Sequence, residues 1–331
     1  MGFLSNIFKK KKPVTIELPD PTFDDTPGPE VVDSQPADAT IPTASGQQDT
    51  TVVSLRGKSQ HVGKRPLTVG CASHVGRVRQ RNEDSILIAT SMTSGETDLP
   101  PFGLFVVADG MGGHSDGHKA SQLASRIVAR DVMGQIYPPS LHIPSDPAEP
   151  NQPIQDILQE SLQAANWQVS ATYPESGTTL TAALLLGNRL YLAHVGDSRA
   201  YLIPGDAASA ISKELPAALL TLDHSFVQRL QDAGQITPEE AAVHPQRNIL
   251  YRAVGQGEKL KVDTFSRPVS PPGWLLLCSD GLWGVVSAEL IHAVITSAAN
   301  PQQACDKLVE AALNAGGPDN ISLIIVRISK T

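Results

Sequence analysis

Three aspartates in this sequence stand where an apolar segment meets glycine. Asp109 directly follows the apolar run 105–108, and Asp280 follows the run 274–278 after a single serine. Asp319 lies in a Gly-Gly-Pro-Asp-Asn sequence just before the last apolar run of the chain. Apolar runs with β-branched residues are typical of buried strands. A strand that ends in a carboxylate holds that group at the edge of a core, where its oxygens can bind a hard divalent cation.

The glycines after Asp109 indicate how its carboxylate would be presented. Gly110, Gly112 and Gly113 let the backbone turn with positive φ and let ligands approach main-chain atoms closely. We therefore expect a tight loop that exposes Asp109 at the end of its strand. The alternative for this motif alone is an ordinary turn, which aspartate favours for its own hydrogen bonds. Recurrence of the pattern at Asp280 favours a metal-binding role.

A second group of candidate residues precedes the apolar segment 86–89. Glu83 and Asp84 form an acidic pair, and Arg79 and Arg81 lie just before them. A guanidinium binds a phosphate through two hydrogen bonds, and adjacent carboxylates can hold a cation that the same phosphate bridges. Ion pairing at the protein surface is the alternative for this stretch.

Asp197 offers a further carboxylate after an apolar segment. It follows the run 190–195 and one glycine, and Arg199 lies two residues beyond it. A turn aspartate paired with Arg199 and a metal ligand are both consistent with this pattern. The residues alone leave the two interpretations open.

An all-oxygen set of side chains is typical of one kind of chemistry. Glu83, Asp109, Asp280 and Asp319 lack the neighbouring cysteines or clustered histidines that zinc favours, and they suit Mg²⁺ and Mn²⁺. Two such ions about 4 Å apart can deprotonate a bridging water and direct it at phosphorus. An arginine would also neutralise charge on the phosphoryl oxygens during in-line attack. The sequence contains no P-loop or dinucleotide-binding fingerprint.

The intervening sequence predicts the elements that position these residues. Helical spacing of apolar residues predicts helices at 119–136, 154–169, 226–233, 287–298 and 301–314. Strands are expected at 67–72, 86–89, 105–108, 178–186, 190–195, 200–203, 274–278 and 321–328. Residues 176–202 are expected to form one antiparallel sheet, and 137–153 a proline-rich loop. Two small polar helices between Asp223 and Asn248 predict a mobile flap over a site.

Composition and charge exclude several classes of protein. The chain has 331 residues, 40% hydrophobic and 18% charged, as in a soluble globular protein with a sizeable core. Its formal net charge of -8 argues against non-specific nucleic-acid binding. Cys71, Cys278 and Cys305 include no CxxC pair, which indicates a reducing compartment and neither a zinc site nor a disulfide framework. No apolar run approaches the roughly 20 residues that span a bilayer, and no secretory signal is visible.

Residues 1–65 are predicted to form a disordered tail and linker before a folded domain at 66–331. Between residues 13 and 54 there are eight acidic residues and no lysine or arginine, a composition that buries too little apolar surface to offset its ordering entropy. Residues 1–12 combine an apolar patch with four lysines, as in a weak contact with anionic lipid or a solvated basic tail. We expect a cytoplasmic protein with at most peripheral association at the inner membrane surface.

Together these motifs resemble those of the type-2C (PPM) metal-dependent protein phosphatases, in their bacterial form. The resemblance covers residues 67–329, with motifs in family order at Arg79 to Asp84, Asp109 to His114, Ser176-Gly177-Thr178-Thr179, Gly196 to Arg199, Asp223-His224-Ser225, Ser279-Asp280-Gly281 and Gly317-Pro318-Asp319-Asn320. It implies an α+β fold in a four-layer α-β-β-α sandwich, with two antiparallel sheets packed face to face and helices on both outer sides. It also implies hydrolysis of phosphoserine and phosphothreonine in proteins by metal-activated water, without a phosphoenzyme.

The resemblance implies a set of ligands for two Mn²⁺ or Mg²⁺ ions. Asp109 would bridge the two ions. Asp280 and Asp319 would complete the ligands of one ion, while Glu83 and the Gly110 carbonyl would serve the other. Each role is carried over by position in the matching motifs.

Further roles follow from the same resemblance. Asp84 would hold metal-bound water, and Arg79 would bind the substrate phosphate. Asp197 with Asp280 would form a third, weaker metal site near the flap. The family's eukaryotic members carry a histidine, proposed as general acid, directly after Asp-Gly, and this chain has Met111 there. His114 could substitute, or it could support the loop, in which case metal-bound water would protonate the leaving group.

The resemblance implies phosphorylated proteins, the products of a serine/threonine kinase, as substrates. We expect a monomer that binds no nucleic acid. One alternative is a catalytically silent member that acts as a regulatory or binding module. Such members usually lose a metal-binding carboxylate, whereas Asp109, Asp280 and Asp319 are all present. Another alternative is a metal-dependent phosphoesterase acting on non-protein substrates, which only a substrate panel separates from the first.

Overall fold

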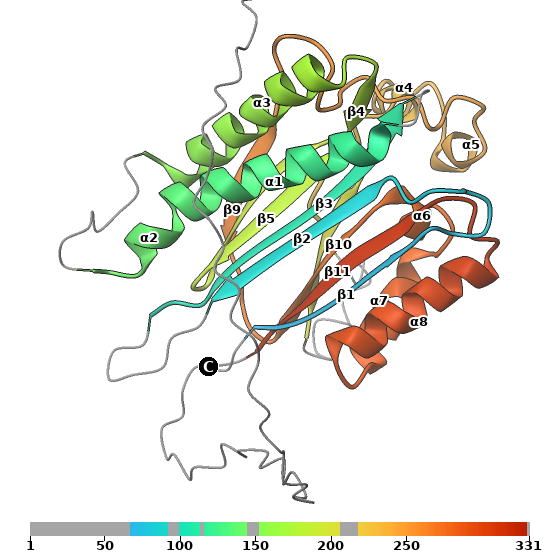
Figure 1. The fold of residues 1–331 in the computed structure, drawn as a ribbon. Helices are drawn as coiled ribbons and strands as arrows, with labels where there is room; N and C mark the ends of the chain where they lie inside the picture. Colours follow the sequence, from blue (N-terminus) through green and yellow to red (C-terminus); the bar gives the residue numbers. More distant parts are fainter. Residues whose placement is uncertain (1–66, 92–98, 113–115, 144–151, 206–217, 330–331) are drawn as a thin grey trace, which may run out of the picture. The chain divides into compact units, whose positions relative to one another are not determined.

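The computed structural model describes residues 67–91, 99–112, 116–143, 152–205 and 218–329, all within the compact unit Lys58–Thr331. The expected tail at 1–65, the lipid contact expected of residues 1–12, and His114 lie outside these ranges. The described residues form two antiparallel β-sheets with helices beside each (Figure 1). Within these ranges, no helix has both the length and the apolar character needed to cross a bilayer.

The first sheet contains both the first and the last described strands of the chain. Its order is β1 (Thr68–His74), β11 (Ile321–Ile328), β10 (Gly273–Cys278), β7 (Arg199–Pro204) and β8 (Ala218–Leu219). β1 runs antiparallel to β11, so that Thr68 lies opposite Arg327 and His74 lies opposite Ile321.

The second sheet is built around β3, which carries the first candidate aspartate. Its order is β2 (Asp84–Ser91), β3 (Phe102–Gly112), β5 (Leu180–Leu186), β6 (Arg189–Val195) and β9 (Asp263–Pro268). The short strand β4 (Ser176–Thr178) pairs with the last three residues of β3. Gly187 adopts a φ of +61° in the tight hairpin predicted between β5 and β6.

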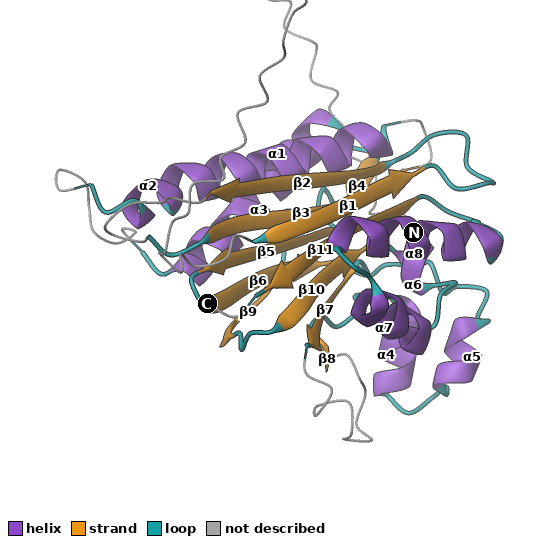
Figure 2. Ribbon diagram, turned by 90° about the horizontal axis from the view of Figure 1, so that it is seen from below, coloured by secondary structure: helices purple, strands orange, loops and turns teal. Residues whose placement is uncertain are grey.

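Helices cover the outer face of each sheet (Figure 2). The second sheet is covered by α1 (Gly117–Gln135) and α3 (Ile154–Thr172), with the short α2 (Tyr137–Ser140) after α1. The first sheet is covered by α6 (Asp280–Trp283), α7 (Ala288–Ser297) and α8 (Pro301–Asn314). Between β8 and β9 lie α4 (Phe226–Asp232) and α5 (Pro238–Ala242), the latter started by a Thr237–Glu240 capping box.

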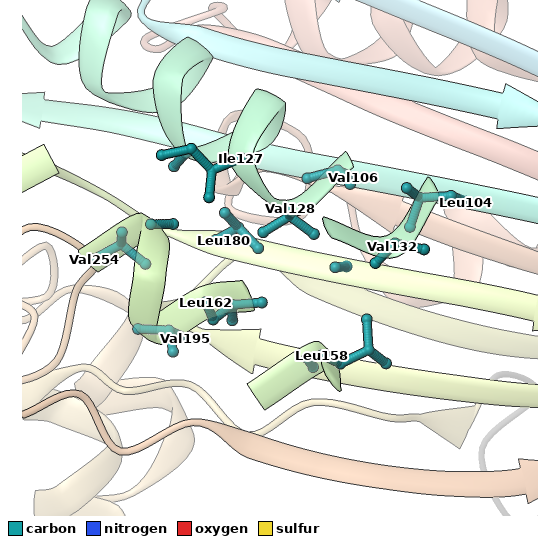
Figure 3. Close-up of a cluster of buried hydrophobic side chains, with 14 of the residues drawn as sticks. Leu104, Val106, Ile127, Val128, Val132, Leu158, Leu162, Leu180, Val195 and Val254 are labelled. Carbon is teal, nitrogen blue, oxygen red and sulfur yellow. The ribbon is translucent and has the colours of Figure 1, made fainter. Parts of the chain in front are cut away.

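Strand periodicity separates the core into three hydrophobic layers. On β3, Leu104 and Val106 face α1 and α3 (Figure 3), whereas Phe105 and Val107 face the first sheet. On β10, Leu275 and Leu277 join the layer between the sheets, and the intervening residues pack against α7 and α8. Three such layers require four layers of elements, which confirms the predicted α-β-β-α sandwich.

Several predicted elements differ from the observed ones. β7 belongs to the first sheet and not to that of β5 and β6, so 176–202 is not one sheet. The run 178–186 is split into β4 and β5 at Thr179, and the expected loop after α1 begins with α2. β8 and β9 were not predicted. These differences have one cause. Short or half-polar strands form by pairing with strands elsewhere in the chain, and local periodicity does not reveal those partners.

Candidate active site

Asp109 lies within a strand and not in a loop beyond one. β3 continues through Gly110, Met111 and Gly112, because β4 pairs with this end of the strand. The expectation of a tight loop that exposes Asp109 is therefore wrong. Asp109 is instead a half-buried residue of the strand itself, directly opposite Asp84 of β2.

Gly110 is required for close packing and not for a positive φ. A Cβ added to Gly110 would overlap the carbonyl oxygen of Gly117 and would lie 2.6 Å from the carbonyl oxygen of Glu83. The Gly110 N–H donates to the same Glu83 oxygen at 3.1 Å. The absence of a side chain thus allows the start of α1 and the entrance to β2 to close on the strand beside Asp109.

Asp280 and Asp319 meet Asp109 at one end of the two sheets. Asp280 is the first residue of α6, one serine after the end of β10, and Asp319 lies two residues before β11. Since β10 and β11 are antiparallel neighbours, the end of one and the start of the other lie together. Asn320 then fixes the other sheet against this corner, because its Oδ1 accepts the Glu83 N–H at 2.8 Å.

A cavity of about 170 Å³ lies at this corner of the molecule. Its walls include seven of the nine predicted site residues: Arg79, Glu83, Asp109, Gly110, Asp197, Asp280 and Asp319. Asp84 is buried and does not line the cavity, and His114 lies outside the described residues. Met111, Gly112, Thr179, Asn248, Leu250 and Asn320 complete the walls.

Crowding and burial disfavour the charged form of these carboxylates. Burial, and then the charges of Asp84 and Asp280, hold the pKa of Asp109 well above its usual value. Burial also raises the pKa of Asp280 to about 6 and that of Asp84 to about 7. The charge of Asp319 is the next largest cause of the raised pKa of Asp280. Carboxylates this crowded repel one another unless protons or cations neutralise them.

The donor set fits a divalent cation. Among the described residues, Oδ1 of Asp84 and Oδ1 of Asp280 are buried and have no hydrogen-bond partner. No three acidic, histidine or cysteine side chains in these ranges already converge as a metal site. One reason is that Asp319 binds protein instead: its Oδ2 accepts from Arg79 at 2.7 Å. The oxygen donors are thus assembled in one cavity, although not in a final coordination geometry.

Asp84 is oriented from the opposite sheet. Its Oδ2 accepts the Ser279 hydroxyl at 2.8 Å, and Ser279 Oγ accepts the Ser322 N–H at 3.0 Å. Ser279 directly precedes Asp280. The Ser279 side chain therefore links Asp84, which lies behind the cavity, to the segment that carries Asp280, which lines the cavity.

The turn that carries Asp197 is held by its main chain. Gly196 has a φ of +112°, and both of its polar main-chain atoms bind His224: its N–H donates to Nδ1 at 3.0 Å, and its carbonyl accepts the His224 N–H at 2.8 Å. Trp283 Nε1 donates to the Asp197 carbonyl at 3.1 Å. These contacts leave the Asp197 side chain free to face the cavity.

Arg199 is not the ion-pair partner of Asp197. Its guanidinium binds both carboxylate oxygens of Asp223, at 3.1 and 2.8 Å, and stacks on Trp283 at 3.5 Å from the ring centroid. The interpretation of Asp197 as a turn residue paired with Arg199 is therefore wrong.

The sequence does not predict two residues that support this site, Asp263 and Trp283. Asp263, at the start of the unpredicted β9, accepts from His224 Nε2 at 3.1 Å and from Arg252 at 2.8 Å. Trp283, three residues after Asp280, supports the Asp197 turn. The predicted flap does border the cavity, through Asn248 at its end, and its mobility stays a prediction.

Comparison with known proteins decides the family. The family model for protein phosphatase 2C matches residues 77–311, more than half of the chain. The chain belongs to the protein phosphatase 2C family. Its resemblance to type-2C phosphatases, inferred from the motifs, is thus confirmed.

Bacterial members of the protein phosphatase 2C family are clear relatives. The serine/threonine protein phosphatase PstP of Mycobacterium tuberculosis (strain H37Rv) is 35% identical over 268 residues, which cover 79% of this chain and 45% of PstP. The chain thus matches less than half of the length of that relative. The serine/threonine phosphatase stp of Listeria innocua is 34% identical over 258 residues, which cover 76% of this chain and 92% of stp.

Solved structures of family members share the fold. A crystal structure of the M. tuberculosis phosphatase PstP/Ppp matches with a TM-score of 0.62 and 35% identity, covering 80% of this chain and 99% of that one. The catalytic domain of PstP in complex with two manganese ions matches with a TM-score of 0.61 and 33% identity, covering 80% and 99%.

Proposed function

We propose that this protein is a metal-dependent protein serine/threonine phosphatase that hydrolyses phosphoserine and phosphothreonine. The observation that carries the proposal is the convergence of Asp109, Asp280 and Asp319, from distant parts of the sequence, on one small cavity. Family membership and the activity named for PstP and stp support it.

Two Mn²⁺ or Mg²⁺ ions, with a third bound more weakly, are the proposed cofactors. The PstP catalytic domain binds two manganese ions, and the oxygen donors here suit the same cations. We assign Asp109 to both ions, Asp280 and Asp319 to one, and Glu83 with the Gly110 carbonyl to the other. When bound, the ions supply Lewis-acid activation of water and neutralise charge on phosphoryl oxygens.

The weaker site is assigned to Asp197 and Asp280. Both carboxylates line the same cavity, and after burial the charge of Asp280 is the main cause of the raised pKa of Asp197. The held main chain of the Asp197 turn supports this role, because only the side chain has to adjust to a ligand.

The remaining assigned residues act on the substrate and on water. Arg79, whose side chain is 50% exposed, can turn its guanidinium to the substrate phosphate once Asp319 engages a cation. Asp84 holds water from behind the cavity wall, since one of its oxygens is already fixed by Ser279. His114 remains a proposed proton donor to the leaving serine or threonine oxygen.

Phosphoproteins are the proposed partners, acted on by a monomer that binds no nucleic acid. Residues 66–331 are proposed as the phosphatase domain, and 1–65 as a tail. A cytoplasmic location, with peripheral contact of residues 1–12 with the inner membrane, completes the proposal. Sedimentation with anionic liposomes, comparing the full chain with a chain starting at Leu67, tests the lipid contact.

Phosphate release from a phosphothreonine peptide tests the activity. With Mn²⁺ we expect turnover that EDTA abolishes and that added Mn²⁺ restores. Asp109→Ala should abolish turnover, because it removes the ligand assigned to both ions. Full activity of Asp109→Ala would contradict the bridging role. Absence of wild-type turnover on phosphoserine and phosphothreonine peptides would favour a silent module, and a preference for small phosphoesters would favour a non-protein substrate.

A further inference from the structure

One residue contacts both the strand end of Asp109 and the turn of Asp197. Thr179, which is 2% exposed, lies at the break between β4 and β5. Its N–H donates to the Asp109 carbonyl at 2.8 Å, and its Oγ1 accepts the Asp109 N–H at 2.8 Å. Both polar main-chain atoms of Asp109 therefore bind Thr179.

The break between β4 and β5 explains why the Asp109 N–H binds a side-chain hydroxyl, that of Thr179. The main chain of Thr178 pairs with Val254, through Thr178 N–H to Val254 O at 2.9 Å and the reverse bond at 2.8 Å. Asp109 thus faces the residue at which β4 gives way to β5, and its N–H is accepted by a hydroxyl and not by a carbonyl. A buried N–H without an acceptor is costly, so the hydroxyl is needed there.

The same hydroxyl reaches the turn of the weaker site. Thr179 Oγ1 and Ser198 Oγ share a hydrogen bond at 2.7 Å, and both residues are buried. Thr179 also packs on Gly196: a Cβ added to Gly196 would lie 2.6 Å from the Thr179 methyl carbon. Thr179 therefore contacts the residues on either side of Asp197 as well as the main chain of Asp109.

We propose that Thr179 is a positioning residue that couples the Asp109 pair of Mn²⁺ sites to the weaker Asp197 site. The inference rests on the proposed function, because it assigns a new role within the same metal centre. Since one hydroxyl fixes the main chain behind both carboxylates, loss of that hydroxyl loosens both. Residues that orient metal ligands in this way affect metal affinity strongly although they do not touch the metal.

Binding of Mn²⁺ alone, measured by calorimetry, tests the coupling without any substrate. Thr179→Val keeps the shape of the side chain and its packing on Gly196 but leaves the Asp109 N–H and Ser198 Oγ without their partner. We expect its Mn²⁺ dissociation constants to rise about 10- to 100-fold at both kinds of site. Thr179→Ser keeps the hydroxyl and should restore both constants to within about threefold of the wild-type values.

Two further variants separate coupling from a general loss of stability. Ser198→Ala removes only the link to the Asp197 turn, so it should weaken the weaker site and leave the tighter pair within about threefold. Thr221 is also buried, and its hydroxyl accepts the Ala200 N–H at 3.2 Å, not a main-chain group of either aspartate. Thr221→Val should lower the unfolding temperature but bind Mn²⁺ as the wild type does.

The outcomes distinguish this inference from the function on which it rests. Wild-type protein that binds no Mn²⁺ would overturn the metal centre itself. Wild-type protein that binds Mn²⁺, with Thr179→Val equal to it, would overturn only the role of Thr179. Equal losses in Thr179→Ser and Thr179→Val, or in Thr221→Val and Thr179→Val, would do the same. If Thr179→Val does not fold, Thr179→Ser and Ser198→Ala decide the question.

Discussion

Asp197 differs from the other cavity carboxylates in the way it is held. Its main chain is fixed by His224 through Gly196 and by Trp283, and Arg199 is engaged by Asp223. Its carboxylate faces the cavity. Removing that carboxylate should therefore leave the rest of the corner in place.

We expect Asp197→Ala to lower kcat/KM about 10- to 100-fold at limiting Mn²⁺, the range usual when a group that supports a bound metal ion is removed. The tighter pair of Mn²⁺ sites should remain, because Asp109, Asp280 and Asp319 are untouched. Phosphate release measured across a Mn²⁺ titration, alongside the binding stoichiometry, checks both points. An unchanged rate at limiting Mn²⁺ would count against the weaker site.

His194 is a second residue whose environment has a measurable consequence. Its ring is buried between Thr181 Oγ1, at 2.9 Å from Nδ1, and the Leu222 carbonyl, at 3.1 Å from Nε2. Burial, and then the neighbouring His224, lower its pKa from 6.5 to about 3. The folded protein thus keeps His194 neutral at pH values where the unfolded chain binds a proton.

Stability should therefore fall as the pH decreases from about 6.5 toward 3, by up to about 1.4 kcal/mol per pH unit from this residue. His194→Gln keeps polar atoms in place but does not titrate, so its free energy of unfolding should decrease less over the same range. Urea unfolding of both proteins at pH 7.5, 6.5 and 5.5 in one Mn²⁺-containing buffer measures the difference. Parallel curves would show that His194 makes no contribution.

At the scale of elements, the site depends on how closely β3 approaches the start of α1. The Gly117 and Glu83 carbonyls leave no space for a Cβ at Gly110. We expect Gly110→Ala to lower the free energy of unfolding by about 1–3 kcal/mol, since the backbone must shift to admit the methyl group. Guanidinium unfolding without divalent ions measures this independently of metal binding.

The same helix provides a matched control. Gly134, near the end of α1, has nothing within 4 Å of an added Cβ and has an ordinary helical φ. Gly134→Ala should raise the free energy of unfolding by about 0.5–1 kcal/mol, because alanine loses less conformational entropy in a helix. Equal effects of the two substitutions would refute the packing argument.

The sequence predicts a helix or strand correctly where the local pattern of apolar residues is enough to define it. The helices that became α1, α3, α7 and α8 and the last strand were predicted within a few residues, because their apolar periodicity is strong. The end of β3 was not, since its continuation depends on pairing with β4, far along the chain. The sheet to which β7 belongs was not predictable for the same reason.

The sequence predicts the acidic residues of the candidate site better than it predicts the residues that hold them in place. A repeated pattern of strand, aspartate and glycine identifies Asp109 and Asp280 from the sequence alone. Contacts such as Trp283 to the Asp197 carbonyl and Thr179 to the Asp109 main chain are tertiary, and no local pattern encodes them. The acidic groups thus follow from sequence, whereas the residues that hold them require the fold.

At the scale of the whole molecule, the carboxylates that line the cavity come from both sheets. Asp109 comes from β3 of the second sheet, whereas Asp280 and Asp319 adjoin β10 and β11 of the first. A divalent ion bound by all three would therefore link both halves of the sandwich and offset the repulsion among their charges.

Mn²⁺ should consequently raise the unfolding temperature, by an amount that corresponds to about 2.7 kcal/mol per site at a hundredfold excess over the dissociation constant. EDTA should reverse the shift. Differential scanning calorimetry at a series of Mn²⁺ concentrations measures the dependence, and Asp109→Ala should show a smaller shift. Identical unfolding temperatures in Mn²⁺ and EDTA would contradict binding across the sheets.

The pairing of β1 with β11 also determines where the polypeptide enters the sandwich. Thr68 lies beside Arg327, and His74 beside Ile321, only two residues from Asp319. The entry point is therefore separated from the carboxylate corner by six residues of strand, roughly 20 Å. An affinity handle or surface tether joined ahead of Leu67 would therefore attach to the sandwich roughly 20 Å from the carboxylates on which the proposed activity depends.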